Sequence, residues 1–145
     1  MKILVTGNLG YVGNVLTRIL LQQKIDVIGC DTGFYPQGFL DLEDSKCTQI
    51  KKDIRDLSAE DLKGVSGICH LAALSNDPLG EINPNLTEEI NYKATIRLAK
   101  LAKQAKVEKF IFSSSCSSYG MNENIVDEES ELSPLTAYAK SKVNS

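Results

Sequence analysis

The chain has 145 residues, 42% of them hydrophobic and 24% charged, with a formal net charge of -3 at pH 7. This composition is typical of one soluble globular domain with a buried core. The mild negative charge argues against nucleic acid or an anionic membrane as the main partner, because both need clustered positive charge. No apolar run approaches the length of a membrane span, and no signal peptide precedes the first strand.

Short apolar runs alternate with amphipathic stretches along the chain. We expect strands at residues 3–5, 26–30, 48–51, 67–71 and 109–113. Strands that alternate with helices predict right-handed βαβ units. The expected fold is therefore α/β, a Rossmann-like doubly wound parallel sheet that is truncated after about five strands.

Two stretches have the apolar spacing of an amphipathic helix. The first carries its apolar residues at Val12, Val15, Leu16, Ile19 and Leu20, and the second at Ile90, Ala94, Leu98, Leu101 and Ala105. Residues 37–44 and the acidic run Asp127–Glu129 are predicted to be surface loops.

The four cysteines form no CxxC pair and have no zinc-like spacing to His70, the single histidine. We therefore expect no metal site and a reducing, cytoplasmic compartment. Cys30 and Cys69 end apolar runs and are expected in the core. His70 is expected to form a hydrogen bond at the end of its strand rather than to act as a general base.

A glycine-rich turn, residues 6–13, follows the first strand and opens the first helix. This is the context that a dinucleotide-binding fingerprint requires. Glycines let the backbone approach a pyrophosphate, and the helix N-terminus offers N–H groups and a positive dipole end. A turn without any ligand is the alternative that glycines alone leave open. The predicted cofactor contacts here are Gly7, Asn8, Leu9, Gly10, Tyr11, Val12 and Gly13.

Asp31 ends the second strand, about 20 residues beyond the glycines, where an acidic residue can bind the adenosine ribose hydroxyls. Its charge would repel the 2′-phosphate of NADP, and residues 32–45 contain no Lys or Arg. We therefore predict NAD as the cofactor. The alternative is that Asp31 only caps a turn.

The pattern TGxxGxxG resembles the extended branch of the short-chain dehydrogenase/reductase superfamily, the NAD-dependent nucleotide-sugar epimerases and dehydratases. Further segments agree in order and spacing: Asp53–Asp56, His70–Ala73, Asn91, Ser113–Ser115 with Tyr119-Gly120, and a YxxxK at Tyr138–Lys142. The resemblance implies further cofactor contacts at Asp53, Ile54, Leu71, Ala72, Ala73, Asn91, Ser113, Ser114, Tyr138 and Lys142.

The YxxxK spacing places Tyr138 and Lys142 on one helix face. A lysine ammonium beside a phenol favours the phenolate, which can take a proton from a sugar hydroxyl while hydride leaves the same carbon. The resemblance adds Ser115 as the residue that binds the reacting oxygen. The predicted catalytic residues are thus Tyr138, Lys142 and Ser115.

The dehydratases of this family carry an Asp-Glu pair just after the serine or threonine position, where this chain has Cys116 and Ser117. This difference favours epimerase or simple redox chemistry; an NAD-dependent reductase or dehydratase and a non-catalytic NAD-binding module are the alternatives.

Family members are considerably longer. We therefore expect residues 1–145 to be an incomplete NAD-binding domain whose C-terminal substrate domain is absent. The expected partners are a nucleotide sugar in the full-length enzyme and copies of the chain in a homodimer or higher oligomer.

Overall fold

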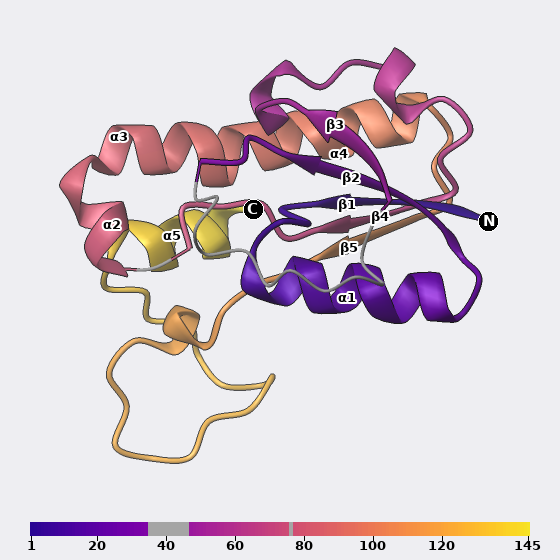
Figure 1. Ribbon diagram of the computed structural model, residues 1–145. Coiled ribbons are helices and arrows are strands. Elements are labelled where there is room, and N and C mark those ends of the chain that lie inside the picture. Colours follow the sequence, from indigo (N-terminus) through magenta and orange to yellow (C-terminus); the bar gives the residue numbers. More distant parts are fainter. Residues whose placement is uncertain (35–46, 76) are drawn as a thin grey trace. The chain divides into compact units, whose positions relative to one another are not determined.

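Five parallel strands form one sheet in the order β3-β2-β1-β4-β5 (Figure 1). They are β1 (Lys2–Thr6), β2 (Asp26–Asp31), β3 (Thr48–Lys51), β4 (Gly67–His70) and β5 (Lys109–Phe112). Every predicted strand is present, with ends within one residue of the expected ones. The order runs outward from β1 in both directions, as in a Rossmann-like doubly wound sheet, which confirms the predicted fold class.

The computed structural model describes residues 1–34, 47–75 and 77–145. The predicted loop at 37–44 lies outside the described residues. The chain divides into two compact units, one made of Met1–Ala72 with Arg97–Ser113 and the other of Ala73–Ile96 with Ser114–Ser145. The whole sheet belongs to the first unit.

The helices are α1 (Tyr11–Gln22), α2 (Asp77–Ile82), α3 (Pro84–Thr87), α4 (Ala94–Gln104) and α5 (Ala137–Asn144). Short 3₁₀ turns occupy Ile54–Asp56, Glu60–Leu62 and Cys116–Tyr119. The second predicted helix is longer than expected, because α3 continues through a π-helical segment, Glu88–Lys93, into α4. Such wide turns are rare and often occur at functional sites.

The buried face of α1 differs from the apolar stripe that its sequence suggests. Gly13, Asn14 and Thr17 are its buried residues, whereas Val12 is 61% and Ile19 50% exposed. Leu16 and Leu20 of the predicted stripe do pack against the sheet, so apolar periodicity identified only part of the buried face and missed its small residues. In α4 the predicted positions Ala94 and Leu98 are buried as expected, but the next buried residue is Ala102 rather than Leu101, which is half-buried.

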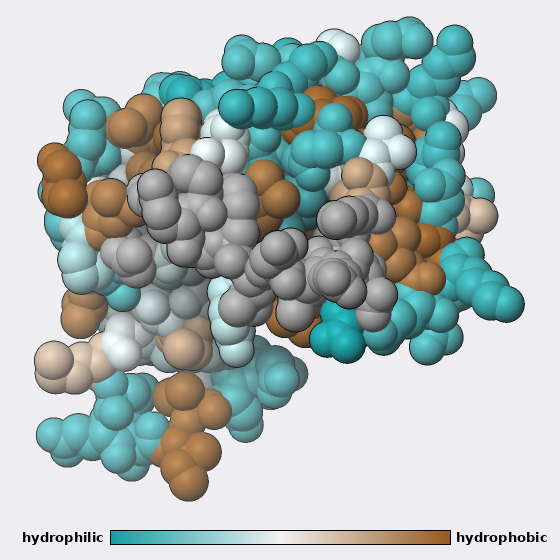
Figure 2. Space-filling model, in the orientation of Figure 1, coloured by the Kyte–Doolittle hydropathy of each residue, from teal (hydrophilic) through white to brown (hydrophobic). Residues whose placement is uncertain are grey.

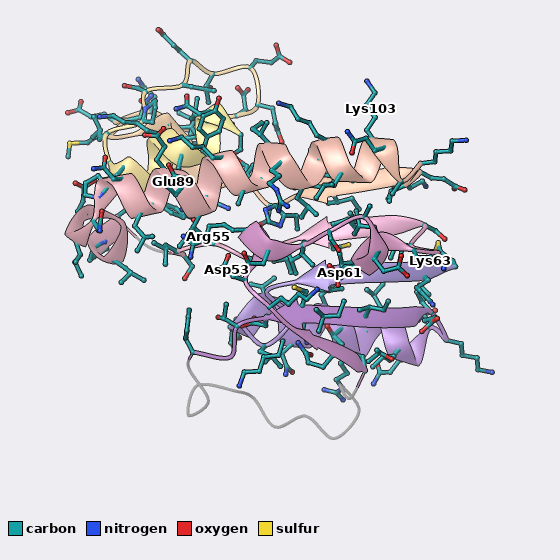
Figure 3. The ribbon with its side chains drawn as sticks, turned by 90° about the horizontal axis from the view of Figure 1, so that it is seen from above. Asp53, Arg55, Asp61, Lys63, Glu89 and Lys103 are labelled. Carbon is teal, nitrogen blue, oxygen red and sulfur yellow. The ribbon has the colours of Figure 1, made fainter. Side chains whose placement is uncertain are left out.

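Side chains alternate between the two faces of the sheet. Ile3, Val5 and Val27 form a cluster on one face, with Leu16 and Leu20 of α1 packed against it. The neighbouring positions Leu4 and Ile68, paired between β1 and β4, belong to the opposite face and are almost fully buried. Figure 3 shows α1 and the C-terminal part of α4 on opposite sides of the sheet, so helices cover both faces, as in a doubly wound fold.

Several large apolar side chains remain exposed, among them Val12 and Ile19 of α1 and Ile111 of the edge strand β5. Hydrophobic patches interrupt the hydrophilic surface on the face that Figure 2 shows. Within the described residues, no helix has the length and apolar character needed to cross a membrane.

Candidate functional site

The glycine turn is packed so tightly that two of its glycines have no room for a side chain. Gly7 has φ +74°, a backbone conformation that favours glycine, and a Cβ there would lie 2.8 Å from Ala72 N. A Cβ on Gly13 would lie 2.1 Å from the Gly7 carbonyl oxygen. Both distances are shorter than real Cβ contacts. The predicted need for glycine at these positions therefore has a direct steric cause.

The N-terminus of α1 follows this turn without a side-chain cap. Its N-cap residue is Gly10, and its first turn carries no acidic residue. Tyr11 and Val12, at the helix start, are exposed. The first N–H groups of a helix lack intrahelical partners, and with the helix dipole they favour an anion. The arrangement therefore suits a phosphate group.

Asp31 lies at the carboxyl end of β2, beside the turn. Its Oδ2 accepts a hydrogen bond from Leu9 N at 3.3 Å, and its Oδ1 accepts one from Gly33 N at 2.9 Å. The turn and the predicted ribose-binding carboxylate are thus brought together. The sequence argument considered only residues 32–45, which contain no Lys or Arg. The structure adds one cation near Asp31, because Lys51 of β3 is its register partner.

A polar cluster holds the segment after β4 beneath the turn. The Thr6 hydroxyl accepts hydrogen bonds from Leu71 N at 3.2 Å and Ala72 N at 3.3 Å, and it lies 2.6 Å from His70 Nδ1. His70 is 1% exposed, which confirms the prediction of a hydrogen-bonded histidine. This cluster fixes Leu71 and Ala72 next to Gly7, so the backbone of these predicted contacts is well positioned.

Asp53 caps the 3₁₀ turn that follows β3. Its carboxylate accepts hydrogen bonds from Arg55 Nη2 at 2.7 Å and Nε at 3.1 Å, and the two side chains lie side by side in Figure 3. These bonds from Arg55 hold the pKa of Asp53 below its ordinary value. Ile54 is 5% exposed, so its side chain belongs to the core and only its backbone can contact a ligand.

In the second unit, α5 carries the predicted catalytic pair on one face. Lys142 Nζ lies 5.7 Å from the centroid of the Tyr138 ring. Lys142 is 6% exposed, and this burial lowers its pKa from 10.5 to about 8. The structure therefore brings the two predicted catalytic residues together on α5.

Asn91 lies in the π-helical segment and is 1% exposed. Its Oδ1 accepts a hydrogen bond from Leu74 N at 2.8 Å, and its Nδ2 donates to Leu74 O at 3.1 Å and Ser141 Oγ at 3.2 Å. The amide therefore binds the chain after Ala73 to α5. This geometry favours a structural role over the predicted cofactor contact through the side chain.

Ser115 precedes the 3₁₀ turn Cys116–Tyr119, and its hydroxyl accepts a hydrogen bond from Ser117 N at 3.2 Å. The turn contacts α5, so Ser115 is close in the fold to the helix that carries Tyr138. Ser113 and Ser114 are exposed, as is Cys116. The exposed run Asp127–Glu129 confirms the predicted surface loop.

Helix α2 anchors the start of α5, which the sequence did not suggest. Thr136 caps α5 through Ala139 N at 3.1 Å and donates a short hydrogen bond to Asp77. Glu81 accepts a hydrogen bond from Ala137 N at 2.5 Å. These contacts fix the backbone on both sides of Tyr138.

Residues 3–145 match the model of the NAD dependent epimerase/dehydratase family. YtcB, an uncharacterized UDP-glucose epimerase of Bacillus subtilis (strain 168), is 35% identical over 99% of this chain and 49% of its own length. TunA, an NAD-dependent NDP-hexosamine 5,6-dehydratase involved in tunicamycin biosynthesis, has a TM-score of 0.89 at 28% identity, over 99% of this chain and 46% of its own. MoeE5 in complex with UDP-glucose and NAD has a TM-score of 0.88 at 28% identity, over the same shares. The chain spans about half the length of these relatives. It belongs to the NAD-dependent epimerase/dehydratase family.

Proposed function

We propose that this chain is the cofactor-binding part of an NAD-dependent nucleotide-sugar epimerase. The observation that carries the proposal is the glycine turn, closed so tightly at Gly7 and Gly13 that only glycine fits, and joined to Asp31 through Leu9 N. The similarity to MoeE5, solved with UDP-glucose and NAD, supports the cofactor and the substrate class.

The residues of the first unit fit the adenosine and pyrophosphate half of NAD. The turn and the uncapped N-terminus of α1 would receive the pyrophosphate. Asp31 uses one lone pair on each oxygen for Gly33 and Leu9, which leaves acceptor capacity for the ribose hydroxyls. Asp53, Leu71 and Ala72 would complete this half through the roles that the family resemblance implies.

The preference for NAD over NADP can be tested by calorimetry with the 145-residue chain. Asp31 should repel a 2′-phosphate, so NADP should bind far more weakly than NAD. Lys51 is the register partner of Asp31. The substitution Asp31→Ala should therefore leave a cation beside the ribose site and reduce the difference between the affinities for NAD and NADP. A second change, Lys51→Ala, should then weaken NADP again. Equal affinities of the parent chain for both cofactors would contradict the assignment.

The residues of the second unit fit the proton transfer of the reaction. NAD, when bound, supplies the hydride acceptor for oxidation at a sugar carbon. Tyr138 would take the proton of the sugar hydroxyl, Lys142 would favour the phenolate and hold the nicotinamide ribose, and Ser115 would bind the reacting oxygen. Epimerisation then requires only that hydride return to the other face of the keto sugar.

The chemistry at Cys116 and Ser117 favours an epimerase over a dehydratase. Elimination of water needs an acid and a base near the sugar, and neither a thiol nor a hydroxyl is a good substitute for the Asp-Glu pair of the dehydratases. The similarity to TunA, a dehydratase, keeps dehydration as the second candidate. A reductase and a non-catalytic module are weaker candidates, the latter because the Tyr138–Lys142 pair is present.

The reaction can be tested by product analysis. A protein extended to the length of the relatives should interconvert UDP-glucose and UDP-galactose, whereas a 4-keto-6-deoxy product would identify a dehydratase. The 145-residue chain itself should bind NAD weakly and turn over neither sugar, because we place the sugar pocket in the half of the relatives that this chain does not span. Robust turnover of either UDP-sugar by the 145-residue chain alone would contradict this placement of the sugar pocket.

We also propose a homodimer or higher oligomer and a cytoplasmic location. In the 145-residue chain the edge strand β5, with Ile111 61% exposed, should favour self-association of this chain, which light scattering can test; the oligomer of a longer protein needs its own measurement. All four cysteines are free, which suits a reducing compartment.

A further inference from the structure

The side chain of Asn8, in the glycine turn, pairs with Gln49 of β3. Asn8 Nδ2 donates to Gln49 Oε1 at 2.8 Å, and Gln49 Nε2 donates back to Asn8 Oδ1 at 3.1 Å. Asn8 is 3% exposed, so its half of this reciprocal amide pair is shielded from water. The pair joins two segments that lie 41 residues apart in the sequence.

Gly29 of β2 makes room for this pair. A Cβ at Gly29 would lie 2.2 Å from Asn8 Nδ2, 2.4 Å from its Cγ and 2.7 Å from its Oδ1. Gly29 is also the register partner of Gln49 across the β2–β3 pair. The turn, β2 and β3 therefore each contribute one residue to a single packing arrangement, in which the Asn8 amide lies over Gly29 and reaches Gln49.

The turn is consequently held at three successive residues. Gly7 N donates to Cys30 O at 2.8 Å, and Leu9 N donates to Asp31 Oδ2 at 3.3 Å. Between them, Asn8 is held by its side chain through Gln49. These contacts hold the backbone of the turn against β2 and β3 from within the protein, without any contribution from a ligand.

We propose that Gln49 is a positioning residue for the phosphate-binding turn, and that it acts through Asn8. The proposal rests on the proposed binding of NAD. A turn that already has its bound conformation loses less conformational entropy when the pyrophosphate binds, and the affinity is higher for that reason. The effect should be larger for ligands that carry phosphates than for adenosine, because Asp31 keeps its hydrogen bond from Gly33 N, which does not involve the turn, even if the bond from Leu9 N weakens.

The test compares Gln49→Leu, Asn8→Ala and the double variant in the 145-residue chain, titrated calorimetrically with ADP and with adenosine. Each single change should weaken ADP binding about tenfold, which corresponds to about 1.4 kcal/mol, and should weaken adenosine binding much less. The double variant should bind ADP with the same affinity as the single variant that binds it more weakly, because the two residues act as a pair. Gln22→Leu, the same substitution at an exposed position of α1, is the matched control and should change neither affinity.

Gln49→Thr repeats the test with a β-branched residue that an edge strand accepts, in case the leucine variant does not fold. Unchanged ADP affinity, equal losses for ADP and adenosine, or additive losses in the double variant would each overturn the role of Gln49. If the parent chain binds neither ADP nor adenosine, the proposed function and the role of Gln49 both fail.

Discussion

The substitution Gly13→Ala tests the tightest contact of the candidate site. The new methyl group would lie 2.1 Å from the Gly7 carbonyl oxygen, whereas ordinary contacts begin at 3.4 Å, so these groups must separate by about 1.3 Å. The obstacle is backbone rather than a flexible side chain. Overpacking of this kind costs about 1–3 kcal/mol, while the higher helix propensity of alanine returns at most about 1 kcal/mol. Because the contact is about 1.3 Å too short against backbone, the cost should lie at the upper end of this range, and we expect a net loss of about 2 kcal/mol.

For a chain of this length the entropy of unfolding is roughly 0.3 kcal/mol per kelvin, so Tm should fall by about 7 °C. The displaced turn should also bind NAD at least tenfold more weakly. Gly10→Ala is the matched control in the same turn, because its methyl would lie 3.3 Å from the same oxygen and its φ is -74°; its loss should stay below about 1 kcal/mol. Thermal unfolding and calorimetry measure both effects. Equal behaviour of the two variants would refute the steric argument.

Three further predictions concern catalysis and pH. Tyr138→Phe, in a protein of the relatives' length, should abolish most turnover but spare NAD binding, because only the proton acceptor is lost; near-full turnover would refute the mechanism. Because burial lowers the pKa of Lys142 to about 8 from 10.5, stability should rise between these pH values by roughly 3 kcal/mol, and urea melts of Lys142→Met should lack this rise. Burial alone would raise the pKa of Asp61, but hydrogen bonds from Lys52 and Ser58 outweigh it and lower the pKa. The stability that Asp61 contributes is thus present above about pH 4 and lost as pH falls further, so Asp61→Asn should destabilise at pH 7 but much less at pH 3.

The strands were predictable because a parallel sheet covered on both faces leaves short, continuous apolar runs in the sequence. The inner face of α1 was predicted only in part. Leu16 and Leu20 pack on the sheet, but Gly13, which lies against the turn, and Thr17 are buried where periodicity favours larger apolar residues. The π-helical segment was not predictable. Its buried residue is the polar Asn91, whose burial depends on hydrogen bonds to Leu74 and Ser141.

The glycine turn and Asp31 were predictable because their order along the chain is itself the signal. Gln49 and Lys51 were not. Their importance comes from the register of β2 with β3, which pairs Gly29 with Gln49 and Asp31 with Lys51. Nothing in the sequence between residues 31 and 48 specifies that register, so the partners of the turn become visible only in the folded sheet.

Hydrogen-bonding capacity distinguishes the polar side chains that can meet a ligand from those that only support the site. The amide of Asn91 spends both donor hydrogens and one acceptor position on Leu74 and Ser141, and the Asn8 amide is turned inward to Gln49. The Asp31 carboxylate has about four lone-pair positions and uses one on each oxygen for backbone N–H groups. Those two bonds fix its orientation and leave acceptors for hydroxyl groups. Removing Asn91 would instead take away the partners of the part-buried Leu74 N–H and C=O groups and of the Ser141 hydroxyl, at up to about 1 kcal/mol for each bond. Asp31 substitutions should therefore change affinity and cofactor choice, whereas Asn91 substitutions should first change stability.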